Sequence, residues 1–104
     1  MYYIYMLRCS DNSIYTGITV NVEKRMQEHF NKTEKCAKYT YSHDAKKLEC
    51  VWQTSTKSLA CKLEYYIKML KKNEKELLIK DDKLLGALLK DKVPIDEYEK
   101  VAMS

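Results

Sequence analysis

The chain has 104 residues, of which 45% are apolar when Tyr, Trp and Cys are included, and its formal net charge is +4. This length suits one compact domain, and this apolar content is enough for a core, which excludes wholesale disorder. Two glycines and one proline exclude collagen-like and linker-like chains. No apolar run reaches the roughly 18 residues of a membrane span, and the first residues do not resemble a secretion signal. We therefore expect a soluble cytoplasmic protein with no membrane association.

Residues 2–9 and 14–19 are rich in aromatic and β-branched types and are predicted to form the two strands of a hairpin. Residues 11–13 (Asp-Asn-Ser) supply the turn chemistry between them. Both faces of the first strand are apolar, so we expect a central strand that is covered on each side. Gly17 interrupts the second strand and predicts a bulge or a close approach of another group to the backbone.

A helix is predicted at about residues 22–30, with Asn21 as its N-terminal cap. Val22, Met26 and Phe30 recur at helical spacing, and we expect them to form its buried stripe. This stripe would dock the helix on the sheet.

The polar, lysine-rich residues 31–47 are expected to form a loop with one short helical turn, and residues 48–54 a third strand. Ser55, Thr56 or Ser58 can cap the long helix that follows. Leucine and isoleucine at helical spacing give this helix a core face.

The long helix is expected to end near Lys72, and Asn73 with Glu76 has the spacing of a capping box that starts another helix. A further amphipathic helix is predicted at about residues 82–91. After a proline, residues 95–101 are expected to form a last, acidic helix.

The predicted order β-β-α-β-α, followed by a helical tail, is that of an α+β domain. We divide the chain into a body at residues 1–80 and a helical C-terminal extension at residues 81–104. The body carries 15 of the 19 basic and 9 of the 15 acidic side chains, so the body is basic and the extension acidic. The lysines of residues 57–80 are expected to be a solvated helix face. The two arginines, Arg8 and Arg25, need individual explanations, because the planar guanidinium of arginine binds phosphate better than the ammonium of lysine does.

Four cysteines stand at positions 9, 36, 50 and 61. No two of them have Cys-x-x-Cys spacing, and neither histidine completes a zinc-finger pattern. We expect Cys9, Cys36, Cys50 and Cys61 to be reduced, buried thiols that pack as small hydrophobic groups.

The candidate site residues lie on the predicted hairpin and on two of the helices that follow it: Tyr5, Tyr15, Arg25, His29 and Glu64. Taken singly, each has an ordinary explanation. The tyrosines can pack across the hairpin, Arg25 and His29 share a helix face, and Glu64 can pair with Lys68 one turn later.

In combination these residues resemble a known family. Tyr3-Ile4-Tyr5 and Tyr15-Thr16-Gly17, with the helix of Arg25 and His29 and the later Glu64, are similar to the GIY-YIG nuclease domain. The resemblance is strongest to its small stand-alone bacterial members, which also carry an Ala-Lys-Tyr-Thr segment, here at residues 37–40. It covers about residues 2–80 and leaves the C-terminal extension outside.

The resemblance implies a three-stranded antiparallel sheet flanked by helices. It also implies an endonuclease that uses one divalent cation, Mg²⁺ or Mn²⁺, to hydrolyse DNA phosphodiester bonds in DNA repair or processing. The DNA partner would include branched or single-stranded forms.

Carried over position by position, Tyr5 and Tyr15 are the paired tyrosines of the signature strands, with Tyr3, Ile4, Thr16 and Gly17 completing the signature. Arg25 would contact the scissile phosphate, and His29 stands where the family has His or Tyr. Glu64 would be the single carboxylate ligand of the metal. Lys38 and Tyr39 are candidate nucleic-acid contacts. A tyrosine acting as general base near neutral pH would need a lowered pKa or a metal-bound water.

The sequence also departs from the family pattern. Tyr3 replaces the first glycine of the signature, and Ile18 stands where several relatives have a lysine. The arginine-rich run that close relatives carry after Lys-Tyr-Thr is missing. These departures keep two alternatives open, a nucleic-acid-binding module with little activity of its own and a protein-interaction domain that binds a partner or a second copy through its leucine-rich tail. The oligomeric state is not predicted.

Overall fold

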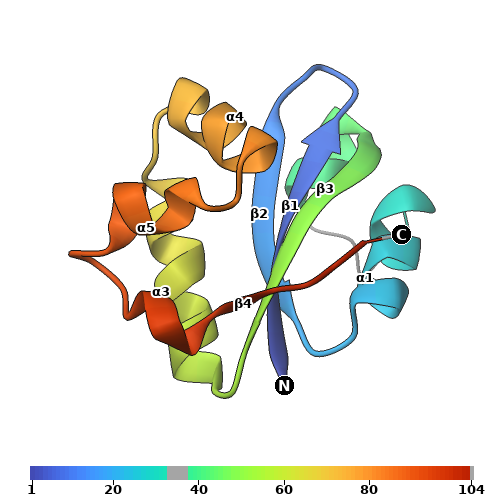
Figure 1. Ribbon diagram of the computed structural model, residues 1–104. Coiled ribbons are helices and arrows are strands. Elements are labelled where there is room, and N and C mark those ends of the chain that lie inside the picture. Colours follow the sequence, from blue (N-terminus) through green and yellow to red (C-terminus); the bar gives the residue numbers. More distant parts are fainter. Residues whose placement is uncertain (33–37, 104) are drawn as a thin grey trace.

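The computed structural model describes residues 1–32 and 38–103, in which helices cover both faces of one antiparallel sheet (Figure 1). The sheet has four strands in the order β2-β1-β3-β4. Their bounds are β1 (Tyr2–Cys9), β2 (Ile14–Thr19), β3 (Ala45–Thr54) and β4 (Glu99–Lys100). The predicted α+β class and the hairpin are confirmed, whereas the expectation of three strands is wrong.

Strand β1 lies in the middle of the sheet, and its side chains enter two separate hydrophobic clusters. Ile4 and Met6 belong to the larger cluster, whereas Tyr5 and Leu7 belong to the smaller one on the opposite face. All four side chains are at most 1% exposed. The prediction of a central strand covered on both sides is therefore confirmed.

The helices divide between the two faces. Helix α1 (Val22–Phe30) packs on the face of the smaller cluster through Met26. Helices α3 (Lys57–Lys68), α4 (Lys72–Lys80) and α5 (Leu84–Leu89) contribute to the larger cluster, on the other side of the sheet (Figure 1). The short helix α2 (Lys38–His43) supplies the helical turn that was expected before the third strand, and β3 begins three residues earlier than predicted.

Helix α1 begins as the sequence predicts, because the Asn21 side chain accepts a hydrogen bond from the backbone N–H of Lys24 at 3.1 Å. Its buried stripe differs from the prediction. Phe30 is 42% exposed, and His29 is fully buried together with Met26. The buried stripe therefore contains Met26 and His29, three residues apart, instead of Met26 and Phe30, four residues apart. As a result the His29 imidazole faces the sheet.

Helix α3 uses Thr56 as its cap and ends at Lys68. Helix α4 then begins at Lys72, where the backbone N–H of Lys71 donates to Glu74 at 2.9 Å. The predicted cap at Asn73 is therefore wrong, because Glu74 satisfies the backbone two residues earlier. Glu76, the other half of the predicted capping box, turns toward the sheet instead.

The predicted acidic helix at residues 95–101 is wrong. A single 3₁₀ turn, η1 (Ile95–Glu97), leads into β4, which pairs with β3. Two side chains hold this turn: the hydroxyl of Thr54 donates to the carbonyl of Glu97 at 2.8 Å, and the hydroxyl of Tyr98 donates to the carbonyl of Leu59 at 2.6 Å. These tertiary bonds favour an extended chain over the local helical pattern.

The C-terminal extension also joins both clusters. Leu85, Leu89 and Val93 are buried in the larger cluster, and Val101 packs against the smaller one. In Figure 1 the chain end accordingly lies on the side of α1.

The cysteine prediction is confirmed for two thiols. Cys9 and Cys50 are buried and reduced. Cys61 is reduced but exposed on α3, so the expectation of burial is wrong there, because this position faces away from the sheet. Cys36 and Ala37 lie outside the described residues. Over the described ranges, every helix is too short or too polar to cross a bilayer.

Candidate active site

Tyr5 occupies the centre of the site, and Gly17 makes room for its ring. The two residues face each other across the β1–β2 ladder. A Cβ atom at position 17 would lie 2.5 Å from the Tyr5 hydroxyl oxygen and 2.7 Å from Cζ. The predicted close approach to the Gly17 backbone is therefore confirmed, and the approaching group is the Tyr5 phenol.

The Tyr5 hydroxyl connects β1 to helix α1. It lies 2.7 Å from Nε2 of His29, and Nε of Arg25 donates to it at 3.4 Å. Because Arg25 donates to the hydroxyl oxygen, we assign the phenol proton to the bond with Nε2, which makes His29 the tautomer protonated on Nδ1. The predicted helix face of Arg25 and His29 thus meets the first signature strand.

Both partners of this bond are held in their neutral forms. Burial raises the pKa of Tyr5 well above its ordinary value; the Arg25 hydrogen bond opposes this effect, and the charges of Tyr15 and Glu64 add to it. Burial, together with the charge of Arg25, lowers the pKa of His29 to about 4. At neutral pH the pair is a phenol that donates to an uncharged imidazole.

Arg25 is positioned from two sides. Its Nη1 pairs with the Glu28 carboxylate at 2.9 Å, while its Nε contacts the Tyr5 hydroxyl. Its side chain is 21% exposed, so the guanidinium lies at the rim of the site. A guanidinium held by these contacts is preorganised to bind an anion.

Tyr15 is the half-buried tyrosine of the pair. Its ring centroid lies 6.2 Å from that of Tyr5 and 5.5 Å from that of His29. On its other side Tyr39 of α2 stacks at 5.6 Å, and His43 stacks on Tyr39 at 4.1 Å. These rings form a continuous aromatic row from the sheet to the surface.

The candidate nucleic-acid contacts Lys38 and Tyr39 differ in their relation to the site. Tyr39 belongs to the aromatic row, and Nδ1 of His43 behind it is hydrogen-bonded to the carboxylate of Asp11 in the hairpin turn at 2.5 Å. Lys38 is exposed at the start of α2. The structure therefore places Tyr39 beside Tyr15.

Glu64 approaches from α3, the helix that lies along β2. Its carboxylate is 3.7 Å from the Lys68 ammonium, which in turn lies 5.6 Å from the centre of the Tyr15 ring. The charge of Glu64 contributes to the raised pKa of Tyr5. Glu64 therefore lies within electrostatic range of the tyrosine pair, at the edge of the sheet.

The remaining signature residues are structural. Ile4 is buried in the larger cluster, and Tyr3 packs against the smaller one. Thr16 is 2% exposed and pairs with Met6, so it points to the face opposite the site. Its hydroxyl has no hydrogen-bond partner among the described residues.

The donor set for a metal is a single carboxylate. Within residues 1–32 and 38–103, no group of three or more His, Cys, Asp or Glu side chains could hold a metal ion. One carboxylate with substrate phosphate oxygens and water is, however, a common way to hold Mg²⁺. Glu64, with a side chain that is 23% exposed, fits this mode of binding.

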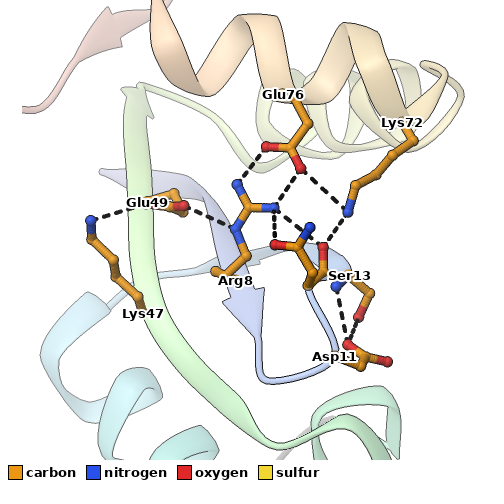
Figure 2. A network of polar contacts seen from close by, with 8 residues as sticks. Arg8, Asp11, Ser13, Lys47, Glu49, Lys72 and Glu76 are labelled. Atoms are coloured by element: carbon orange, nitrogen blue, oxygen red, sulfur yellow. Dashed lines mark hydrogen bonds and ion pairs between the residues drawn. The ribbon is translucent and has the colours of Figure 1, made fainter.

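Two features of the site region were not predicted. Lys68 was expected only as the ion-pair partner of Glu64, yet it also covers the Tyr15 ring. Arg8 had no predicted role and lies between Glu49 and Glu76 (Figure 2). The spacing of Glu64 and Lys68 was the available signal for the first feature, whereas no local pattern indicates the second.

Comparison with known proteins agrees with this geometry. The family model described as the GIY-YIG catalytic domain matches residues 1–77. The UPF0213 protein FN1575 of Fusobacterium nucleatum is 49% identical over 75% of this chain and 76% of its own length. The UPF0213 protein YhbQ of Salmonella typhimurium is 39% identical over 85% of this chain and 86% of its own.

One solved structure is also similar. It is the solution NMR structure of the UPF0213 protein BH0048 from Bacillus halodurans, with 37% identity, a TM-score of 0.49, and coverage of 77% of this chain and 84% of that one. The family model matches well over half of the chain. The protein therefore belongs to the GIY-YIG family, among relatives that are named UPF0213 proteins.

Proposed function

We propose that this protein is a divalent-metal-dependent endonuclease that hydrolyses DNA phosphodiester bonds. The observation that carries the proposal is the convergence of five side chains from four elements on one corner of the sheet: Tyr5, Tyr15, Arg25, His29 and Glu64. A fixed guanidinium can bind the phosphate, a carboxylate can hold a cation, and an accessible phenol can position or deprotonate the attacking water in phosphodiester hydrolysis.

The two tyrosines have different roles in this proposal. Tyr5 is 1% exposed and its hydroxyl is bonded to His29 and Arg25, so it acts as a positioning residue for both. Tyr15 is half-buried, and its ring adjoins both His29 and Lys68. Tyr15 is therefore the phenol that would contact the attacking water.

Arg25 and Glu64 carry the charges of the site. Arg25 would bind the scissile phosphate through its planar guanidinium. Glu64 would hold Mg²⁺ or Mn²⁺ together with phosphate oxygens. When bound, the cation would offset the negative charge that develops at the phosphate and the leaving oxygen.

The second candidate function, a nucleic-acid-binding module with little activity, is favoured by a different observation. Both charged groups of the site already have protein partners, Arg25 with Glu28 and Glu64 with Lys68. A substrate must compete with these ion pairs, which would slow catalysis more than it weakens binding.

The experiment that tests the proposal measures cleavage of duplex, branched and single-stranded DNA with Mg²⁺, with Mn²⁺ and with a chelator. Arg25→Ala is expected to lower the cleavage rate about 100-fold or more, and Tyr15→Phe by a comparable factor. The exposed Tyr65, which is 58% accessible, supplies the matched control Tyr65→Phe, for which the rate should not change.

The outcomes separate the two candidate functions. Metal-dependent cleavage that fails in Arg25→Ala and Tyr15→Phe supports the endonuclease. DNA binding without cleavage under any metal condition supports the binding module. Equal rates in Arg25→Ala, Tyr15→Phe and Tyr65→Phe would remove the proposed site.

A further inference from the structure

Three lysines gather beside the active site where α3 ends and α4 begins. Lys68 is the last residue of α3, Lys72 is the first residue of α4, and Lys75 follows one turn later. We call Lys68, Lys72 and Lys75 the lysine cluster. The Lys68 ammonium, 5.6 Å from the Tyr15 ring centre, connects the cluster to the site.

Glu64 pairs with Lys68 of the cluster at 3.7 Å, whereas two other nearby carboxylates, Glu76 and Glu74, bind groups outside the cluster. Both oxygens of Glu76 accept hydrogen bonds from the Arg8 guanidinium, at 2.6 and 2.5 Å, as Figure 2 shows. Glu74 accepts the backbone N–H of Lys71. Lys72 lies 3.4 Å from Glu76 and donates to the carbonyl of Asn12, but Arg8 already offsets that carboxylate, so the cluster keeps an excess of positive charge.

Lys75 contributes most of the excess positive charge of the lysine cluster. It is half-buried, and no carboxylate among the described residues pairs with its ammonium. Burial and the neighbouring ammonium groups of Lys72 and Lys68 lower the pKa of Lys75. Gathering two further cations around a partly desolvated ammonium costs free energy, and such a cost is typical of sites that bind an anion.

We propose that the lysine cluster binds a backbone phosphate of the nucleic acid that flanks the phosphate held at Arg25. This inference rests on the proposed function, because it identifies a second contact of the same substrate. The substrate strand would pass over Tyr15 from Arg25 on α1 to the junction of α3 and α4. Lysines suit this role, since a point charge on a flexible stem binds phosphate in many orientations.

The test compares DNA binding by the parent chain, Lys75→Gln and Lys68→Gln over a series of salt concentrations, with a chelator present so that no cleavage occurs. Each lost phosphate contact should lower the slope of log K against log salt by about 0.9 for duplex and about 0.7 for single strands. Affinity at low salt should fall about fivefold or more. Lys92→Gln, an exposed lysine in the C-terminal extension, removes the same charge elsewhere and should leave the slope unchanged.

A second measurement separates this inference from the proposed function. The lysine ammonium NMR signals of the parent are followed during titration with inorganic pyrophosphate. Shifts of the Lys68 and Lys75 signals in the parent, with the Lys68 shift lost in Lys75→Gln, support the anion site even if no DNA is cleaved. Cleavage as proposed, with equal slopes in Lys75→Gln and Lys92→Gln and no pyrophosphate shifts, would overturn the cluster alone.

Discussion

At the scale of single residues, the site depends on the fit between Tyr5 and Gly17. The Tyr5 ring lies where any side chain at position 17 would have to be. This contact brings the Tyr5 hydroxyl within reach of His29 and Arg25. One of the two glycines in this sequence is therefore required for the packing of a site residue.

The two glycines give a matched pair of substitutions. Gly17→Ala should destabilise the protein by about 1–3 kcal/mol, because the new methyl group overlaps the Tyr5 phenol. Gly86→Ala meets nothing within 4 Å in helix α5 and should stabilise it by roughly 0.5–1 kcal/mol. Urea unfolding of both variants measures the two effects. A neutral or stabilising Gly17→Ala would refute the close contact.

His29 predicts how stability depends on pH. Its pKa is about 4 in the folded protein and 6.5 ordinarily, so the unfolded chain binds more protons between these values. Stability should therefore fall as the pH drops from about 6.5 toward 4, by on the order of 2 kcal/mol. Unfolding free energies measured over this range should show a smaller pH dependence in His29→Gln.

The control for this effect is His43→Gln, which removes the more accessible histidine, with a side chain 37% exposed, and leaves the His29–Tyr5 bond in place. The contribution of His29 should persist in that variant. If parent and His29→Gln lose stability equally across the window, burial of a neutral His29 is not the cause.

The sequence predicts different site residues to different degrees. Asn21, Gly17 and the tyrosine pair follow from local patterns and from the family signature. The burial of His29 in place of Phe30 does not, because either residue completes a helical stripe. Lys75 is expected from the sequence to be a solvated lysine, whereas in the fold it is half-buried.

At the scale of elements, Arg8 fastens helix α4 to the sheet. The guanidinium lies between Glu49 of β3 at 3.0 Å and Glu76 of α4 (Figure 2). The Arg8 hydrogen bonds lower the pKa of Glu76 to about 2. This contact sets the position of α4 and hence that of the lysine cluster relative to β2.

A double-mutant cycle with Arg8→Met and Glu76→Gln measures this attachment. Two-point pairing should give a coupling energy of about 1 kcal/mol, since Glu76 is 35% exposed and partly screened by solvent. The Lys47–Glu49 pair, with Lys47 71% exposed, is the matched control and should couple by less than about 0.5 kcal/mol. Coupling no larger than in the control would mean that apolar packing alone holds α4.

Element boundaries show why local patterns are not sufficient. The hairpin and α1 are predicted correctly because turn and cap residues determine them locally. The start of α4 depends on a competing local cap, the bond from the backbone N–H of Lys71 to Glu74. The extended β4 depends on bonds to distant residues, such as Tyr98 to Leu59. A competing local cap therefore replaces the predicted Asn73 cap, and interactions across the fold replace the predicted last helix.

At the scale of the whole molecule, the main hydrophobic core and the proposed site lie on opposite faces of the sheet. The larger cluster, under α3, α4 and α5, contains most of the core, whereas the face of α1 carries Tyr5 and His29. From α3, which contacts β2, Lys68 reaches the ring of Tyr15 beside this second face. The C-terminal extension contributes to both clusters, so we expect it to support the fold more than to contact substrate.

The measurement that tests the central claim most directly is the single-turnover rate of DNA cleavage with saturating Mg²⁺, compared between the parent chain and Glu64→Gln. The substitution keeps the shape of the side chain and removes the one carboxylate proposed to hold the cation. We predict a rate at least about 100-fold lower, with an unchanged urea midpoint. Equal rates in the two proteins would contradict the assignment of the active site.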